Sequence, residues 1–446
     1  MMQIARARCR FASRPFALAV WIAAWAAIPP AAAQSLGKLD RERGRAMLAQ
    51  VRSDIEKHYY DPTFRGIDLG SRFDAADQRI RQAKTIEEVF ASVAQVALEL
   101  NDSHTYFLPP ALTVQVQYGW EMQMVGDTCF VTRVKPGSDA AAQGLRVGDA
   151  ILSVNGQVPT RETLWKLLYL YHLLRPQPGL RIMARSSGDA PRQIDVAAKV
   201  RQKHKVIDLT GTDGGTDIWN LIREAESEAS AHISRYEEIG RDLMIWEFAV
   251  FDHFDRRVED GMKRARGRQA LVLDLRGNAG GDERALLELL GHFFKTDVKI
   301  GDLRRRTGIE PLMAKGRGEK AYPGKLLVIV DSQSGSASEV FARTIQITGR
   351  GTVIGDRTAG SVMRSRTFNH KSGVERAIFY ATSVADASVT MSDGSELEGK
   401  GVIPDELLLP SSQDLAAGRD PVLARAATLL GSPMTAEAAG RILRPR

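Results

Sequence analysis

The segment KLLVIVDSQSGSASEVFARTIQITG, residues 325–349 of a 446-residue chain, decides the fold. Its first part, KLLVIVD, is a short apolar run that predicts a buried strand. A loop of small residues follows, and the last part, SEVFARTIQITG, has apolar residues at the three- and four-residue spacing of an amphipathic helix. A strand, a loop and a helix in this order are typical of a parallel sheet covered by helices.

Similar units lie on both sides of this segment. Upstream, QALVLDLR (Gln269–Arg276) predicts a second buried strand, GNAGGDE a glycine-rich turn and RALLELLGHFF a helix. Downstream, GTVIG predicts a third strand and DPVLARAATLL a terminal helix, while the polar stretch EAESEASAHISRYEEI, residues 224–239, is interpreted as helical. We therefore predict an α/β core with a mostly parallel sheet flanked by helices over residues 201–410, followed by a helical tail over residues 411–446.

Two further regions precede the core. Apolar residues at helical spacing predict an N-terminal helical region over residues 34–110. Short strand-like runs such as CFVTRV and DAILSV predict a β-rich module over residues 111–200, interrupted by the helical pieces DAAAQGL and RETLWKLLYLYHLL. The fold class is α/β in the core and α+β overall.

The first 33 residues have the layout of a secretory signal peptide. A basic start with four arginines leads into an apolar run from about Phe16 to Ile28 and then to Ala31-Ala32-Ala33, after which cleavage is expected. The alternative is an uncleaved membrane anchor, for which the apolar run is short. No later apolar run is long enough to span a bilayer, so we expect a periplasmic or secreted protein.

Composition excludes several classes of function. Without the four arginines of the signal segment, the formal net charge falls from +7 to +3, which gives no case for a nucleic-acid partner. Cys129 is the one cysteine left, so neither an internal disulfide nor a Cys-rich metal site can form. The chain has no H-E-x-x-H motif, and GTDGG lacks the context of a phosphate loop, so no metal and no cofactor is predicted.

Two loops of small residues are expected at the carboxyl ends of the core strands, where ligands gather in α/β sheets. These are GNAGG after the first strand and DSQSGSASE after the second. Ser336 and Glu339 in the second loop have the S-x-x-E spacing of a capping box, in which both side chains satisfy amides at the start of a helix. On the residue pattern alone, this structural role is favoured over a nucleophilic one.

Four separate segments change that interpretation, because each resembles part of one family. KLLVIVDSQSGSASEVFA, LVLDLRGNAGG and SDGSELEGKGVIPD (residues 392–405) resemble the motifs of the tail-specific, or C-terminal processing, serine peptidases. VKPGSDAAAQGLRVGDAILSVNG (residues 134–156) resembles a PDZ domain, which these peptidases carry upstream of the core. The resemblance implies a ClpP/crotonase-like core and hydrolysis of unfolded or peptide-like protein substrates, and it leaves the oligomeric state open.

The family's motifs place specific roles on this chain. The resemblance implies that Ser336 is the nucleophile and that the backbone N–H groups of Gly281 and Ala337 form the oxyanion hole, a donor pair that stabilises the charge developing in acyl transfer. The peptide-binding turn of the PDZ-like module falls at Tyr118, Gly119 and Trp120. The next residue in this turn is Glu121, whose charge is unfavourable beside a peptide carboxylate.

The chain differs from the better-known Ser–Lys branch of the family in the residue at the position of the general base. In the T-x-G-K-G motif of that branch, the lysine position holds Ser361. Arg364 and Arg366 lie nearby but cannot be deprotonated. Either the chain is a catalytically inactive peptide-binding scaffold or another group is the base; a weaker alternative is a binding protein for a small apolar ligand.

A second branch, resembling the tricorn protease core, supplies a different base. Its histidine directly follows a serine, and a distant glutamate completes the set. Ser103, His104 and Glu398 match these positions. We predict that His104 takes the proton of Ser336, that Ser103 holds the imidazole in orientation and that Glu398 steadies Ser103.

Overall fold

The computed structural model describes residues 36–110, 114–202, 234–252, 257–372 and 378–442. The expected signal peptide, residues 1–33, lies outside these ranges, as does most of the stretch 224–239 that was interpreted as a helix. The described end of that stretch is a strand, β9 (Arg235–Ile239), so the helical prediction is wrong there. β9 pairs antiparallel with β10 (Leu243–Glu247) in a hairpin that turns at Gly240, whose φ of 61° suits a glycine.

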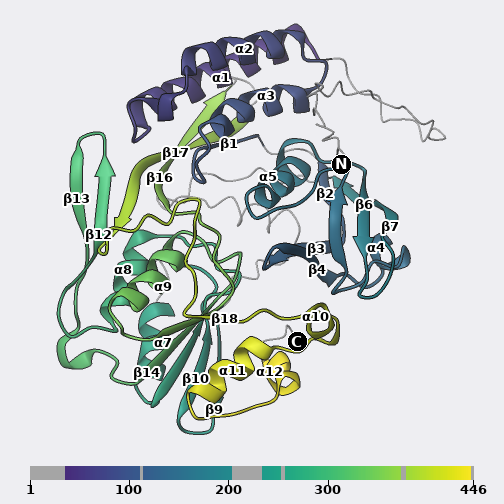
Figure 1. The fold of residues 1–446 in the computed structure, drawn as a ribbon. Coiled ribbons are helices and arrows are strands. Elements are labelled where there is room, and N and C mark those ends of the chain that lie inside the picture. Colours follow the sequence, from purple (N-terminus) through teal and green to yellow (C-terminus); the bar gives the residue numbers. More distant parts are fainter. Residues whose placement is uncertain (1–35, 111–113, 203–233, 253–256, 373–377, 443–446) are drawn as a thin grey trace, which may run out of the picture. The chain divides into compact units, whose positions relative to one another are not determined.

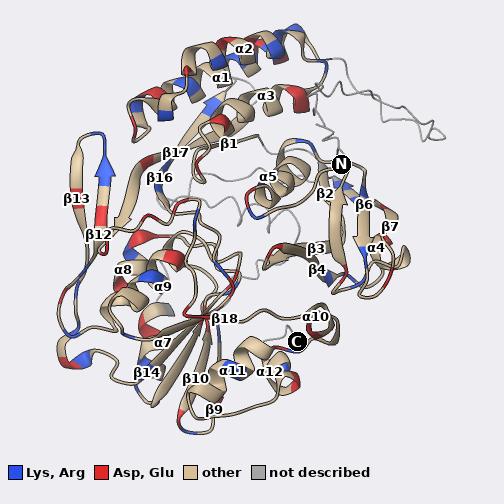
Figure 2. Ribbon diagram, in the orientation of Figure 1, with Lys and Arg blue, Asp and Glu red and all other residues tan. Residues whose placement is uncertain are grey.

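The core is a six-stranded sheet in the order β18-β15-β14-β11-β10-β9 (Figure 1). Every neighbouring pair in it is parallel except β10 with β9, which confirms the predicted sheet. Its central strands carry few charged residues (Figure 2), whereas the edge strand β9 has three. The remaining strands of the sheet are β11 (Ala270–Asp274), β14 (Lys325–Val330), β15 (Thr352–Gly355) and β18 (Glu406–Leu407).

Helices bury both faces of this sheet, because alternate side chains of each strand enter different clusters. Leu271, Leu273 and Val328 pack with the helices on one face, and Val272 and Leu327 pack with the tail helices on the other. The first set of helices is α7 (Arg257–Ala265), α8 (Glu283–Gly291) and α9 (Ala337–Ile347). The tail contains α10 (Ser412–Ala417), α11 (Pro421–Leu429) and α12 (Ala436–Ile442), as predicted in outline.

A second, antiparallel sheet was not predicted. It has the order β1-β17-β12-β13, with β16 also paired to β17. Three N-terminal helices pack near its β1 and β17 strands, which confirms the helical region. The strands are β1 (Tyr106–Leu108), β12 (Val298–Arg305), β13 (Gly308–Ala314), β16 (Met363–Ser372) and β17 (Ile378–Met391). The helices are α1 (Lys38–His58), α2 (Leu69–Gln82) and α3 (Ile86–Glu99). The short turn η1 (Phe64–Gly66) follows α1, and η3 (Gly318–Lys320) precedes β14.

The β-rich module is a five-stranded antiparallel sheet in the order β3-β4-β5-β6-β7, so β3 is an edge strand. A separate pair, β2 (Val114–Gln117) with β8 (Lys199–Gln202), brings the two ends of the module together. The five strands are β3 (Trp120–Val125), β4 (Thr128–Val134), β5 (Ala150–Val154), β6 (Gly179–Arg185) and β7 (Arg192–Ala197). Its helices are α4 (Asp139–Ala142) and α5 (Leu164–Tyr169), the latter continuing into the π-helical turn η2 (Leu170–Leu174).

The module is attached to the core through polar contacts. Arg161 forms an almost buried ion pair with Asp356 at 2.6 Å. The Gln123 amide donates to Asp331 Oδ2 at 2.7 Å, which ties β3 to the loop before α9. Within the residues that the structure describes, no helix is both long and apolar enough to cross a membrane.

Candidate active site

Ser336 lies at the start of α9, directly after the loop that follows β14. Its backbone has φ 51° and ψ −117°, a conformation that non-glycine residues rarely adopt and that costs about 1–3 kcal/mol. The surrounding contacts hold it there: its N–H lies 2.9 Å from the carbonyl oxygen of Ser361 and 3.0 Å from Glu339 Oε2. Glu339 therefore makes its half of the predicted capping box by accepting from the Ser336 N–H. Strained turns of this kind cluster at functional sites.

Glu339 does more than cap the helix. Its buried carboxylate accepts hydrogen bonds from the Thr358 hydroxyl at 2.5 Å and from the N–H groups of Gly360 and Ser361 at 2.8 Å each. Burial raises the pKa of Glu339 to about 7, although these bonds oppose the shift. Glu339 thus ties the turn at Ser336 to the segment 358–361, which also contains the family's lysine position.

The glycine-rich loop after β11 approaches Ser336 closely. A Cβ on Gly280 would lie 2.6 Å from the Ser336 Cβ, and one on Gly281 would lie 2.2 Å from the carbonyl oxygen of Phe251. Gly281 and Ala337 line one pocket with Ser336. In the described part of the chain neither the Gly281 N–H nor the Ala337 N–H donates a hydrogen bond, so both are available to an oxyanion.

Asn278 holds this loop against the Ser336 turn, and the sequence analysis missed it. Its side chain donates to the Phe248 carbonyl at 2.6 Å and accepts from the Gly280 N–H at 2.8 Å. Its own carbonyl oxygen accepts from the Gly335 N–H at 3.0 Å and the Ser338 hydroxyl at 2.8 Å. The asparagine of the D-L-R-x-N-x-G-G motif was the signal that could have identified it.

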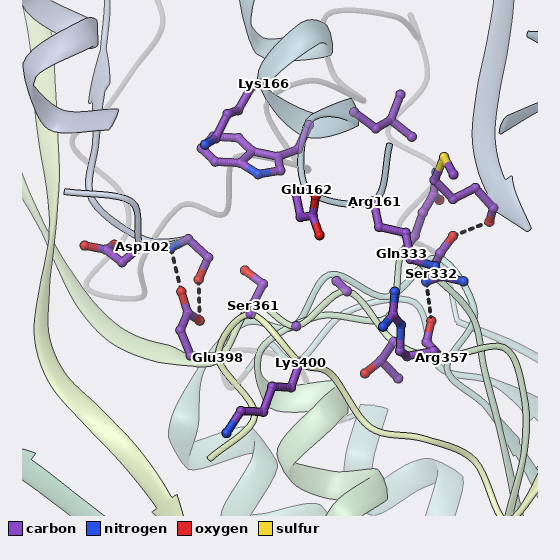
Figure 3. Close-up of a pocket in the computed structure, with 18 of the residues that line it drawn as sticks. Asp102, Arg161, Glu162, Lys166, Ser332, Gln333, Arg357, Ser361, Glu398 and Lys400 are labelled. Carbon is purple, nitrogen blue, oxygen red and sulfur yellow. Dashed lines mark hydrogen bonds between the residues drawn. The ribbon is translucent and has the colours of Figure 1, made fainter. Parts of the chain in front are cut away.

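Ser103, His104 and Glu398, which the resemblance implied for the site, lie in contact with one another. The Ser103 Oγ lies 2.7 Å from His104 Nδ1 and donates to Glu398 Oε2 at 2.9 Å. Glu398 also accepts from the Ser103 N–H at 2.8 Å and from the Val362 N–H at 2.7 Å. Figure 3 shows Glu398 and two of its hydrogen bonds as dashed lines. Three segments far apart in the sequence therefore meet at one carboxylate.

These bonds assign the protons of the histidine. Because the Ser103 hydroxyl donates to Glu398, its oxygen accepts from His104 Nδ1–H, which leaves the lone pair on Nε2. Burial lowers the pKa of His104 to about 4, so the imidazole is neutral at pH 7. Burial, and secondly the charge of Asp102, raise the pKa of Glu398 to about 7.

His104 and Ser336 line the same pocket, of about 90 Å³. Within the described residues no hydrogen bond joins the two side chains, which is common for catalytic groups without substrate. The pocket has an apolar wall beside Ser336. This wall is formed by Leu286, Leu303, Leu312, Val340 and Val389.

The lysine position offers no base. The Ser361 N–H is bonded to Glu339, and its side chain faces a second pocket (Figure 3). Arg364 is held in ion pairs with Glu283 at 3.4 Å and Asp386 at 3.1 Å. A catalytic Ser336 would need a base from another segment.

The predicted peptide-binding turn has buried side chains. The Tyr118 hydroxyl donates to the Tyr171 carbonyl at 3.2 Å and accepts from the Gln177 N–H at 3.0 Å, and Trp120 is 6% exposed. Only the backbone of the turn, with Gly119 at φ 75°, is left to contact a peptide. Glu121 pairs with Arg133 at 2.9 Å, which reduces the unfavourable charge expected there.

One cluster in the described residues has metal-ligand spacing: Glu259, Glu288 and His292. Arg266 donates to His292 Nδ1 at 3.0 Å, and because a guanidinium has no acceptor, Nδ1 holds the lone pair and Nε2 the proton. Nε2 then points its N–H at Glu259 Oε2, 3.4 Å away. The arrangement is that of a histidine–glutamate contact and does not present a ligand nitrogen to a metal.

Comparison with known proteins identifies the family. Residues 243–408 match the profile of peptidase family S41, and residues 113–163 match that of the PDZ domain. Over its core, residues 243–408, the chain is similar to peptidase family S41. The resemblance to tail-specific serine peptidases with a PDZ domain is thereby confirmed, and the family's members named below are proteases.

Individual relatives of this chain agree with that similarity. It is 23% identical to the carboxyl-terminal-processing protease of Picosynechococcus sp., over 74% of this chain and 75% of the relative. It is also 23% identical to the tail-specific protease of Haemophilus influenzae, over 76% of this chain but 48% of that protein. Its fold is similar to the crystal structure of mature CPAF, with a TM-score of 0.64 and 14% identity over 85% of this chain and 95% of the other.

Proposed function

We propose that the chain is an exported serine endopeptidase in which Ser336 attacks the peptide bond and His104 is the general base. The observation that carries this proposal is the chain of bonds from Glu398 through Ser103 to His104 Nδ1, with Nε2 left as an acceptor in the pocket that Ser336 lines. The alternative base of the family is a lysine, and Ser361 stands in its place.

The reaction follows from these positions. Ser336 Oγ adds to the substrate carbonyl while its proton moves to His104 Nε2, and the N–H groups of Gly281 and Ala337 stabilise the oxyanion. When the C–N bond breaks, His104 returns the proton to the leaving amine. Water then adds to the acyl-enzyme with His104 again as base, which releases the acid and restores Ser336.

The substrate class comes from the surroundings of the site. The apolar wall of the Ser336 pocket suits an apolar side chain on the acyl side of the cleaved bond. An unfolded protein or peptide can extend through the site and along the free edge of β3 in the PDZ-like module. Export follows from residues 1–33, and mass spectrometry of the secreted protein should find Gln34 at its N-terminus.

Hydrolysis of casein by the purified protein tests the proposal. Wild type should cleave it, and Ser336→Ala should not. Ser392→Ala is the matched control, because Ser392 is exposed and outside both pockets. Wild type that never cleaves an unfolded substrate would instead favour the inactive peptide-binding scaffold, for which the missing Ser336–His104 bond is the supporting observation.

A further inference from the structure

A second pocket, of about 190 Å³, lies beside Glu398 (Figure 3). Its walls come from the start of α5 in the PDZ-like module, from the segments 357–361 and 398–400 of the core, and from residues 101–103. Ser103 and Ser361 line this pocket, and the residues that follow them, His104 and Val362, line the pocket of Ser336. The two pockets are therefore neighbours, separated by these short segments.

Three cations in the second pocket have no acidic partner. Lys166, Arg357 and Lys400 form no ion pair among the described residues, and the Lys166 amine donates only to the neutral Asn101 amide, at 3.4 Å. Arg161, in contrast, is neutralised by Asp356. In Figure 3, Lys166 and Arg357 lie on opposite sides of the pocket.

The acidic groups of the pocket do not pair with these cations. Glu398 is engaged by Ser103 and Val362, and one Asp102 oxygen accepts from the N–H groups of His104 and Thr105. Glu162 forms no ion pair among the described residues, and none of the three acids pairs with Lys166, Arg357 or Lys400. The Lys166 amine also lies over the Trp165 ring, 5.5 Å from its centroid.

The pocket also lies at one end of the free edge of the PDZ-like sheet. Met124, near the end of β3, and Trp165, near the start of α5, are among its walls. A peptide that adds a strand to β3, with its last residue at the turn before Trp120, would run back along β3 to this pocket. The part of a substrate between that last residue and the cleaved bond would then pass the three cations.

We propose that this pocket binds a carboxylate of the substrate peptide, supplied by an acidic side chain between the PDZ-bound end and the cleaved bond. Lys166, Arg357 and Lys400 are the recognising groups, because charge-assisted hydrogen bonds to carboxylate are among the stronger polar contacts. The proposal rests on the proposed function, since it assigns a preference to the same peptidase. The same three cations could also bind the C-terminal carboxylate of the peptide, and the test distinguishes that carboxylate from an acidic side chain.

The test is binding of labelled peptides to the full-length Ser336→Ala protein, followed by fluorescence anisotropy, because binding does not require hydrolysis. Two twelve-residue peptides differ only in an Asp-Asp or Asn-Asn pair at their centre. We expect the Asp peptide to bind about tenfold more tightly at low salt, as for two or three partly exposed charge pairs, and the difference to shrink as salt is added. Equal affinities would overturn the proposal, whether or not wild type cleaves casein.

Variants locate the effect. Arg357→Ala and Lys166→Ala should each remove most of the preference for the Asp peptide. Arg79→Ala and Lys84→Ala, exposed residues outside both pockets, should keep it. An unchanged preference in both pocket variants would contradict the assignment, and melting curves check that each variant is folded.

A second pair of peptides, amidated at the C-terminus, identifies the source of the carboxylate. Amidation of the C-terminus should leave the preference for Asp over Asn intact. If amidation weakens binding of both peptides equally, and Arg357→Ala makes binding independent of amidation, the pocket binds the terminal carboxylate. The assignment to an acidic side chain is then wrong.

Discussion

The two halves of the proposed catalytic site are built in different ways. Ser336 and the Gly281 loop follow adjacent parallel strands, β14 and β11, so strand pairing places them at the same edge of one sheet. His104 lies just before β1 of the antiparallel sheet, and Glu398, 294 positions later, reaches it through Ser103. The nucleophile is thus positioned within the parallel sheet and its loops, whereas the base depends on contacts between segments of different sheets and loops.

The largest effect should come from adding a side chain at Gly280, next to Ser336. Gly280→Ala puts a Cβ 2.6 Å from the Ser336 Cβ and should lower kcat by about 10²–10³-fold, as for loss of an oxyanion donor, because the loop must move away. Gly188→Ala is a matched control, since Gly188 has a similar positive φ but open space around it. Steady-state hydrolysis by both variants checks this, and equal rates would contradict the close approach.

Removing the negative charge of Glu398, which contacts His104 through Ser103, should have the next largest effect. Glu398→Gln keeps the shape, but its amide can donate to Ser103 and allow the other histidine tautomer. We expect kcat to fall by about 10²-fold, less than the roughly 10⁴-fold seen when an acid touches the histidine directly. If KM alone changes, Glu398 acts in binding and the orientation role is wrong.

The pH dependence of kcat should show whether the protonation state of Glu398 controls activity. Above the Glu398 pKa of about 7 the carboxylate accepts from Ser103 and Nε2 keeps its lone pair, whereas below it the protonated acid can donate to Ser103 and move the proton to Nε2. Activity should therefore rise with pH through about 7, and fall about tenfold per unit well below it, as for a single protonation.

A control is needed because the pKa of Glu339 is also raised to about 7. The profile of Glu398→Gln should lose the midpoint near 7, and that of Glu339→Gln should keep it. If the midpoint near pH 7 is lost in Glu339→Gln and kept in Glu398→Gln, the titrating group is Glu339, beside Ser336.

The smallest effect should come from the contact between the PDZ-like module and the nucleophile half. Gln123 bonds to Asp331, whose other oxygen accepts from the Gly277 N–H at 3.0 Å. Gln123→Ala removes this bond and a longer one to the Ser332 hydroxyl at 3.4 Å, together about 1 kcal/mol, so kcat/KM for casein should fall only a few-fold. A loss as large as that of Gly280→Ala would mean that the module sets the nucleophile's geometry.

The same contrast explains what the sequence could predict. Buried apolar runs such as KLLVIVD identified the parallel strands, since their signal lies within each strand. The antiparallel sheet was missed because its pairing is long-range: Tyr106 pairs with Ser383, and the long strand β17 has no uniform alternation of burial. The segment RYEEI was interpreted as helical although only a turn at Gly240 and pairing with β10 decide that it is a strand.

The site shows the same limit. The strand–loop–helix pattern located Ser336, but the spacing of Glu339 indicated only a cap and not its bonds to the segment 358–361. Asn278 in a glycine-rich loop resembles an ordinary turn residue. His104 could be selected only through a family resemblance, because no local pattern relates it to Glu398.

The rate at which a fluorophosphonate labels Ser336 tests the central claim most directly, because only an activated serine reacts. The account predicts labelling of wild type at Ser336, none of Ser336→Ala and at least a hundredfold slower labelling of His104→Ala, about the smallest contribution expected of a general base. A His104→Ala protein that is labelled at the wild-type rate would contradict the assignment of His104 as the base.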